Sequence, residues 1–171
     1  MTGTSLAGRP IARGVLVAAM TWWAAVGGSH GQSRPLIAWS SDRANPLRVD
    51  RAKAHFDIYT MDDLGNGIRQ ITDAKGDQLL ASWSPDGMRM TFTHDPGATF
   101  DIYIMDSDGG GWAEVTAHPA GDTHSSWSPA GDQLVFTSGR DGQAEIYVVN
   151  VDGSDARNLT LHGGMDVHPA W

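Results

Sequence analysis

The sequence contains no cysteine among its 171 residues. Disulfide frameworks, thiolate metal sites, cysteine nucleophiles and lipidation at a lipoprotein cysteine are therefore excluded. Basic residues are also scarce, with 12 Lys and Arg against 20 Asp and Glu and a net charge of −8 at pH 7. Because no basic cluster offsets this balance, neither nucleic acid nor an anionic membrane surface is expected as the main partner.

Long hydrophobic runs are missing as well. The apolar run Val15–Val26 has 12 residues, whereas a membrane-spanning helix needs about 20. It follows Arg9 and Arg13 and precedes small residues, an order typical of a secretory signal peptide. We therefore expect residues 1–31 to be cleaved and residues 32–171 to be periplasmic or secreted, with no stable membrane insertion after cleavage. The alternative is a buried or uncleaved N-terminal helix.

A unit of 44 residues recurs about three times. The hexapeptide DIYTMD at Asp57 returns as DIYIMD at Asp101 and as EIYVVN at Glu145. Aromatic residues keep the same interval, namely Trp83, Trp127 and Trp171, and Tyr59, Tyr103 and Tyr147. Such a period indicates one supersecondary unit that stacks on copies of itself.

Each unit has the pattern of four short strands. Apolar and polar residues alternate in DQLVFTS and AEIYVVNV, as in half-buried strands. The turns SPDG and SPAG separate the first two strands, and Asp-Gly turns join the last two. The third unit predicts strands at Thr123–Ser128, Gln133–Ser138, Glu145–Val151 and Asp155–Leu161. Four antiparallel strands repeating every 40 to 45 residues form one blade of a β-propeller, and no helix is expected outside the signal peptide.

The order of the motifs resembles the TolB-like propeller repeat, a relative of the WD-type repeats. WSPDG, a strand, D/E-I-Y-x-M-D-x-D-G-S and a strand ending in L-T follow one another over Leu36–Trp171. The expected fold class is all-β, with about three four-stranded blades of an incomplete, six- to eight-bladed propeller. The resemblance implies an extracytoplasmic scaffold, without catalysis, whose top face and central channel bind a protein or peptide partner, as in the Tol-Pal system.

The repeats are out of phase with the blades. Leu36–Ser41 has the pattern of the second strand of a blade, and Val167–Trp171 that of the first strand of another. Twelve strands would make three blades, whereas propellers have about four to eight. Either further blades follow in a longer protein, or two chains form a homodimer by exchanging the terminal strand.

The repeated aromatic residues are the first candidate binding groups. They are Trp83, Trp127, Trp171, Tyr59, Tyr103 and Tyr147. A large ring at the same place in every unit is expected to pack between blades rather than to bind a ligand.

Two of the three units contain a pair of histidines six residues apart. The candidate metal ligands are His118, His124, His162 and His168. Asp122 and Asp166 lie within the pairs, and histidine beside carboxylate can bind zinc or transfer protons. The first unit has Ala74 and Leu80 at the matching places. We therefore expect structural histidines, no metal, no cofactor and no zinc requirement for folding.

Two enzyme hypotheses remain beside the binding module. The chain could be the N-terminal propeller of a longer serine peptidase of the prolyl-oligopeptidase type, or a metal-dependent propeller lyase or hydrolase that uses the histidine pairs. The sequence GGSHG at residues 27–31 matches G-x-S-x-G, but no strand precedes it and no helix follows it, as that motif requires. We expect no enzyme activity from this chain.

Overall fold

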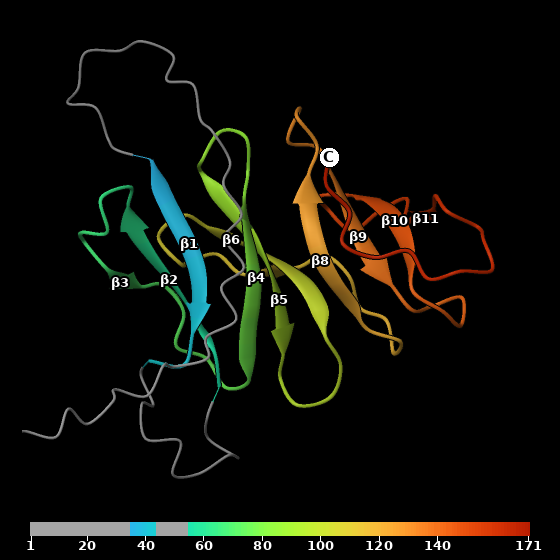
Figure 1. Ribbon diagram of the computed structural model, residues 1–171, viewed down its shortest axis with the longest axis horizontal. Helices are drawn as coiled ribbons and strands as arrows, with labels where there is room; N and C mark the ends of the chain where they lie inside the picture. Colours follow the sequence, from blue (N-terminus) through green and yellow to red (C-terminus); the bar gives the residue numbers. More distant parts are fainter. Residues whose placement is uncertain (1–34, 44–54) are drawn as a thin grey trace, which may run out of the picture.

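The computed structural model describes residues 35–43 and 55–171. Within these residues the regular structure consists of eleven β-strands and no helix, so none of them forms a helix that could cross a membrane. The strands form three antiparallel sheets that stand side by side (Figure 1). The expected signal peptide at residues 1–31 lies outside the described residues.

Each sheet is a meander in which neighbouring strands follow one another in sequence. The first blade contains β1 (Leu36–Ser41), β2 (Asp57–Asp62) and β3 (Arg69–Gln70). The second contains β4 (Asp77–Trp83), β5 (Arg89–Asp95), β6 (Asp101–Asp106) and β7 (Ala113–Glu114). The third contains β8 (Asp122–Trp127), β9 (Gln133–Ser138), β10 (Glu145–Asn150) and β11 (Arg157–Asn158). The all-β propeller architecture predicted from the repeat is confirmed, as an open arc.

The expectation of a twelfth strand at Val167–Trp171 is wrong. No described strand forms a ladder of backbone hydrogen bonds with this segment, and such a ladder is what defines a strand. The backbone N–H of Trp171 instead donates to the Ser126 hydroxyl at 3.3 Å. The C-terminus therefore lies beside β8 (Figure 1).

The turn chemistry expected between the first two strands of a unit is observed. The N–H of Gly87 donates to the carbonyl of Ser84, and that of Gly131 to the carbonyl of Ser128, both at 2.9 Å. Gly87 and Gly131 have φ of 69° and 74°, a region that glycine enters without steric cost. These turns connect β4 to β5 and β8 to β9 in the same geometry.

One aromatic pair recurs at the same register in every blade. The pairs are Trp39 with Tyr59, Phe92 with Tyr103, and Phe136 with Tyr147, with 5.8 Å between ring centroids in each. Such pairs contribute about 0.5 to 1.5 kcal/mol beyond their burial. The rings fix the register of the two central strands of each blade, because a slip by one residue would separate them.

The apolar core lies between blades. One cluster joins the first two blades and includes Ala38, Ile58, Trp83, Met90 and Phe92. A second joins the second and third blades and includes Ile102, Val115, Trp127, Leu134 and Phe136. Each blade is therefore stabilised by its neighbours, as expected for stacked repeats.

In each blade a threonine that follows the outermost strand (β3, β7 or β11) links this part of the chain to the start of the neighbouring strand (β2, β6 or β10). The N–H groups of Ile58, Ile102 and Ile146 donate to Oγ1 of Thr72, Thr116 and Thr160 at 2.8, 3.0 and 3.0 Å. Thr72 and Thr116 are buried, whereas Thr160 is half-buried. The threonine that ends each repeat is thus explained by its hydrogen bond to the neighbouring strand.

Replacing Thr116 with valine should lower the free energy of unfolding by about 1 to 3 kcal/mol. The change keeps the shape of the side chain but leaves the buried N–H of Ile102 without its acceptor. Thr160→Val is the matched control, with a smaller loss because water can reach that site. Urea denaturation measures both, and equal losses at the two positions would contradict the explanation.

The inner strands β4 and β8 share an irregularity. Their pairing with the next strand shifts between Leu79 and Ser82 and between Thr123 and Ser126. Leu80 and His124 lie within these shifts with φ of 59° and 56°, a left-handed conformation that is unfavourable for side chains other than glycine and asparagine. His168, another 44 residues on, has φ of 57°.

Candidate functional site

The loops of the arc emerge on two opposite sides. Because successive strands run antiparallel, residues 71–76, 96–100, 115–121 and 139–144 lie at one edge of the blades, here called the loop face. Residues 84–88, 107–112, 128–132 and 151–156 lie at the other edge, here called the turn face. The sequence candidates divide between these faces.

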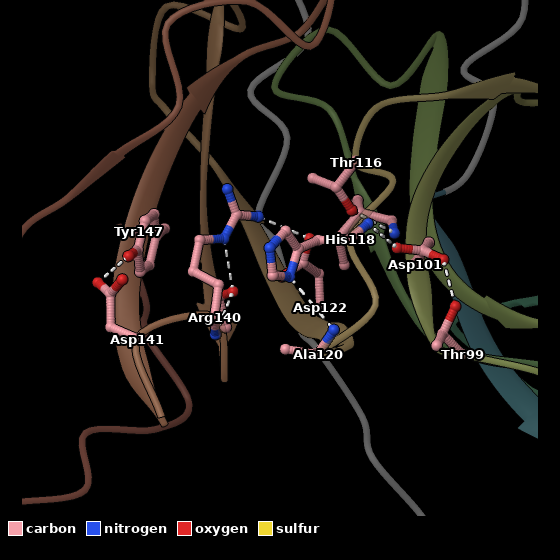
Figure 2. Close-up of polar contacts among 11 residues, drawn as sticks. Thr99, Asp101, Thr116, His118, Ala120, Asp122, Arg140, Asp141 and Tyr147 are labelled. Carbon is pink, nitrogen blue, oxygen red and sulfur yellow. Dashed lines mark hydrogen bonds and ion pairs between the residues drawn. The ribbon is translucent and has the colours of Figure 1, made fainter. Parts of the chain in front are cut away.

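A polar cluster crosses the loop face from the third blade to the second (Figure 2). The Arg140 guanidinium donates to Oδ2 of Asp122 at 2.8 Å and lies 4.6 Å from the Tyr147 ring centroid. The side chain of Asp122 is 0% exposed. Its second oxygen, Oδ1, is buried and has no hydrogen-bond partner in the described part of the chain. Arg140 is therefore the charge that compensates a fully buried carboxylate.

The outer end of the cluster is the contact between Tyr147 and Asp141. The Tyr147 hydroxyl donates to the Asp141 carboxylate, which also accepts a hydrogen bond from the Asn158 amide at 2.8 Å. These two bonds lower the pKa of Asp141 below its ordinary 3.8. Burial, followed by the bond to Asp141, raises the pKa of Tyr147 to about 12. Near neutral pH Asp141 is therefore ionised and Tyr147 is protonated, so the hydrogen bond between them persists.

His118 and His162 form hydrogen bonds that fix the conformation of the loops that follow the second and third blades. The backbone N–H of His118 donates to Oδ1 of Asp101 at 3.1 Å, and its Nδ1 accepts the N–H of Ala120 at 3.2 Å. His162 repeats this arrangement with Glu145 and Gly164 at 3.3 and 3.0 Å. Because Nδ1 of each ring is occupied by a backbone donor, this nitrogen is not available to a metal ion.

The structure brings together histidines from different sequence pairs. The rings of His124 and His168 lie 4.2 Å apart between centroids, at 80° to each other. Nδ1 of His124 lies 3.0 Å from the Thr123 hydroxyl. Burial, and secondly the neighbouring His168, lower the pKa of His124 below 6.5. In residues 35–43 and 55–171 no group of three or more histidines, cysteines or carboxylates is arranged to hold a metal ion.

We expect the free energy of unfolding to decrease as the pH is lowered from about 7.5 to about 5. The pKa of His124 is lower in the folded protein than in the unfolded chain, so the unfolded chain takes up its proton first as the pH falls through 6.5. The loss continues until the pH reaches the folded-state pKa. Urea titrations at each pH measure the effect.

His124→Asn tests this pH dependence. Asparagine tolerates the positive φ at this position but does not titrate, so the variant should lose less stability on acidification. His168→Asn leaves His124 buried and should retain part of the dependence. Identical pH profiles for the wild type and His124→Asn would contradict the assignment.

The repeated tryptophans lie on the other side of the arc, near the turn face. Trp83 and Trp127 are buried, with Trp127 only 5% exposed, whereas Trp171 is 51% exposed. All three line a hollow of about 890 Å³, together with Pro85, Met88 and Pro129. None of the four candidate histidines borders it.

The repeated tyrosines lie on the equivalent strands β2, β6 and β10 of the three blades. Tyr59 and Tyr147 are buried and Tyr103 is half-buried. The Tyr103 hydroxyl donates to Glu114 at 2.9 Å. Burial, and then this bond, raise the pKa of Tyr103 to about 12. These rings contribute to packing, with the two hydroxyls of the second and third blades bonded to carboxylates.

Sequence reasoning missed Arg140 and its counterpart Arg43. Both end a Ser-x-Arg tripeptide, at residues 41–43 and 138–140. In each the arginine N–H donates to the serine Oγ, at 3.2 and 3.4 Å. The second unit has His94-Asp95-Pro96 at this place, so the tripeptide does not recur in every unit. The tripeptide, present in two of three units, was the signal that could have identified these residues.

Comparisons with known proteins agree with this architecture. The family described as TolB beta propeller domain matches residues 38–171. A TolB structure from Agrobacterium tumefaciens is 30% identical, with a TM-score of 0.68, over 78% of this chain and 45% of that one. TolB from Acinetobacter baumannii is 22% identical, with a TM-score of 0.65, over 77% of this chain and 32% of that one.

An enzyme shares the fold as well. The tricorn protease is 18% identical, with a TM-score of 0.52, over 77% of this chain and 12% of that one. This likeness shows the fold alone. No curated protein matches the chain. The chain spans less than half the length of the TolB structures that it matches. With the family matching most of its length, the chain belongs to the TolB β-propeller domain family.

Proposed function

We propose that this protein is a non-catalytic, extracytoplasmic propeller scaffold whose loop face binds a basic peptide or a basic segment of a partner protein. The main support is that hydrogen bonds and an ion pair of the polar side chains fix the conformation of the loops on this face. His118 and His162 bond backbone N–H groups, and Arg140 is committed to Asp122. A face fixed in this way is suited to recognition, because little conformational entropy is lost on binding.

Charge indicates the kind of partner. The exposed carboxylates of the loop face include Asp73 and Asp141, and Asp95 ends β5 beside it. Lys75 is an opposing charge, whereas Arg140 is paired with Asp122. The whole chain has a net charge of −8. Complementary charge increases the association rate and selects among partners, which favours lysine- and arginine-containing segments.

Peptide binding tests the proposal. Fluorescence anisotropy would compare labelled basic, acidic and neutral peptides of equal length at low and high salt. We expect only the basic peptide to bind, more weakly at high salt, and to be recovered intact as judged by mass spectrometry. Asp141→Asn and Asp73→Asn should weaken binding. Asp152→Asn on the turn face is the control and should not.

Two results would contradict the proposal. One is equal binding of all peptides, or of none. The other is hydrolysis of the peptide, which would favour an enzyme. The present geometry offers no support for hydrolysis, since none of the candidate imidazoles His118, His124, His162 and His168 hydrogen-bonds a carboxylate in the described residues.

We also propose a periplasmic or secreted location. The support is the order of charge, apolar run and small residues at the N-terminus, together with the family. N-terminal sequencing of exported material should find residues 1–31 removed. Material that retains Met1 would contradict the proposal.

A further inference from the structure

Within residues 35–43 and 55–171 no inner strand pairs with the first blade at the edge formed by β1. In the second and third blades the inner strands β4 and β8 pair with β5 and β9. Register shows that β1 corresponds to β5 and β9, because Trp39, Phe92 and Phe136 each face the tyrosine of the next strand. Among the described residues β1 pairs only with β2. Unpaired edges of this kind are templates for an added strand.

Arg43 at this edge already has the pose of Arg140. Arg140 lies 5.5 Å from the Phe136 ring and 4.6 Å from the Tyr147 ring. Arg43 lies 4.9 Å from the ring of Trp39 and 5.0 Å from that of Tyr59. In the third blade this pose brings the guanidinium to Asp122 at the start of the inner strand. The first blade therefore places an arginine where the third blade has the cationic half of an ion pair.

The C-terminal segment Met165–Trp171 carries the other half in the matching conformation. The N–H of Asp166 donates to the carbonyl of Ala144 at 2.8 Å, as that of Asp122 does to Phe100 at 2.7 Å. His168 shares the positive φ of His124. Asp166 lies 44 residues after Asp122. The segment thus enters as an inner strand does, with an aspartate at the ion-pair position.

We propose that two copies of this chain associate head to tail, with Met165–Trp171 of each chain pairing antiparallel with β1 of the other. The register follows from β8 and β9, where Asp122 faces Ser138 and Trp127 faces Leu134. It places Asp166 opposite Ser41, Val167 opposite Ser40, Ala170 opposite Ala38 and Trp171 opposite Ile37. Asp166 of one copy then pairs with Arg43 of the other.

Two such junctions close a ring of six blades, within the usual range of about four to eight. They also bury apolar surface, because Leu36, Val167 and Trp171 are 48%, 43% and 51% exposed in the single chain, whereas Trp127 is 5% exposed. The Asp166–Arg43 pair would lie at the loop-face edge of the blades, as Asp122 and Arg140 do. It includes neither Asp73 nor Asp141, the residues whose substitution tests peptide binding, so either proposal can fail without the other.

Reciprocal charge exchange tests the pairing. In the full chain, Asp166→Arg places two arginines at both junctions and Arg43→Asp places two aspartates there, so each variant alone should be monomeric by light scattering. An equimolar mixture of the two variants has one arginine and one aspartate at both junctions and should form a dimer. The double variant should form one as well.

The wild-type chain should have twice the monomer mass. A monomeric wild type would overturn the proposal. A dimeric wild type whose single variants remain dimeric, or whose variant mixture stays monomeric, would also overturn it. Circular dichroism shows whether the single variants keep their β-structure, and the mixture provides an internal check, because unfolded chains would not recombine into a dimer.

Discussion

Phe136→Ala is expected to lower the free energy of unfolding by about 3 to 5 kcal/mol. The ring is 0% exposed and belongs to the core between the second and third blades. It also packs against Tyr147 and lies beneath the Arg140 guanidinium. Truncation removes apolar contacts on both sides and leaves a cavity. Because a domain of this size is stable by only about 5 to 15 kcal/mol, the third blade should be severely weakened.

Urea denaturation, followed by tryptophan fluorescence, measures this loss. Phe100→Ala is the matched control, since the Phe100 side chain is exposed on the loop face, and it should change stability by less than about 0.5 to 1 kcal/mol. A loss at Phe136 no larger than that at Phe100 would show that the interface between blades is not the source of stability.

Arg140→Met should cost about 3 kcal/mol, because it leaves the Asp122 carboxylate buried without a compensating charge. Methionine retains much of the packing against Tyr147, so the loss reports on charge rather than volume. The double variant Asp122→Leu/Arg140→Met removes both charges. We expect it to recover most of the lost stability, since replacing a buried ion pair by apolar groups is often nearly neutral.

Denaturant midpoints for the two variants give the comparison. Arg69→Met is a control for the loss of an arginine, because Arg69 is exposed and its side chain donates to the Asp108 carbonyl at 3.2 Å. This substitution should change stability by about 0.5 kcal/mol or less. If the single and double variants were equally unstable, the buried charge would not be the cause.

The strands could be predicted where alternation and turn residues agree. The bounds Gln133–Ser138 are predicted as observed, because the SPAG turn precedes the buried apolar residues and Gly139 follows them. The outermost strand was predicted at Asp155–Leu161 but spans only Arg157–Asn158. Its residues are mostly exposed, so burial does not extend the pairing beyond two residues.

The arrangement of the candidate site was harder to predict. His118 and His124 are close in sequence, yet His124 packs against His168, 44 residues away. Equivalent positions of successive repeat units come together because the units stack side by side, so the repeat period predicts this contact better than local spacing does. The ion pair of Asp122 with Arg140 was hidden because the second unit replaces these residues with Gln78 and Pro96.

The hydrogen bonds that enter each inner strand determine how the chain folds. The N–H groups of Gln78 and Asp122 donate to the carbonyls of Phe56 and Phe100, both at 2.7 Å, so each blade begins on the backbone of the one before it. A completed blade therefore nucleates the next, and folding can advance along the chain as it is synthesised. Only the second blade has a described neighbour on both sides. Its amides should consequently exchange most slowly with solvent, and cooperativity should decrease towards both ends of the arc.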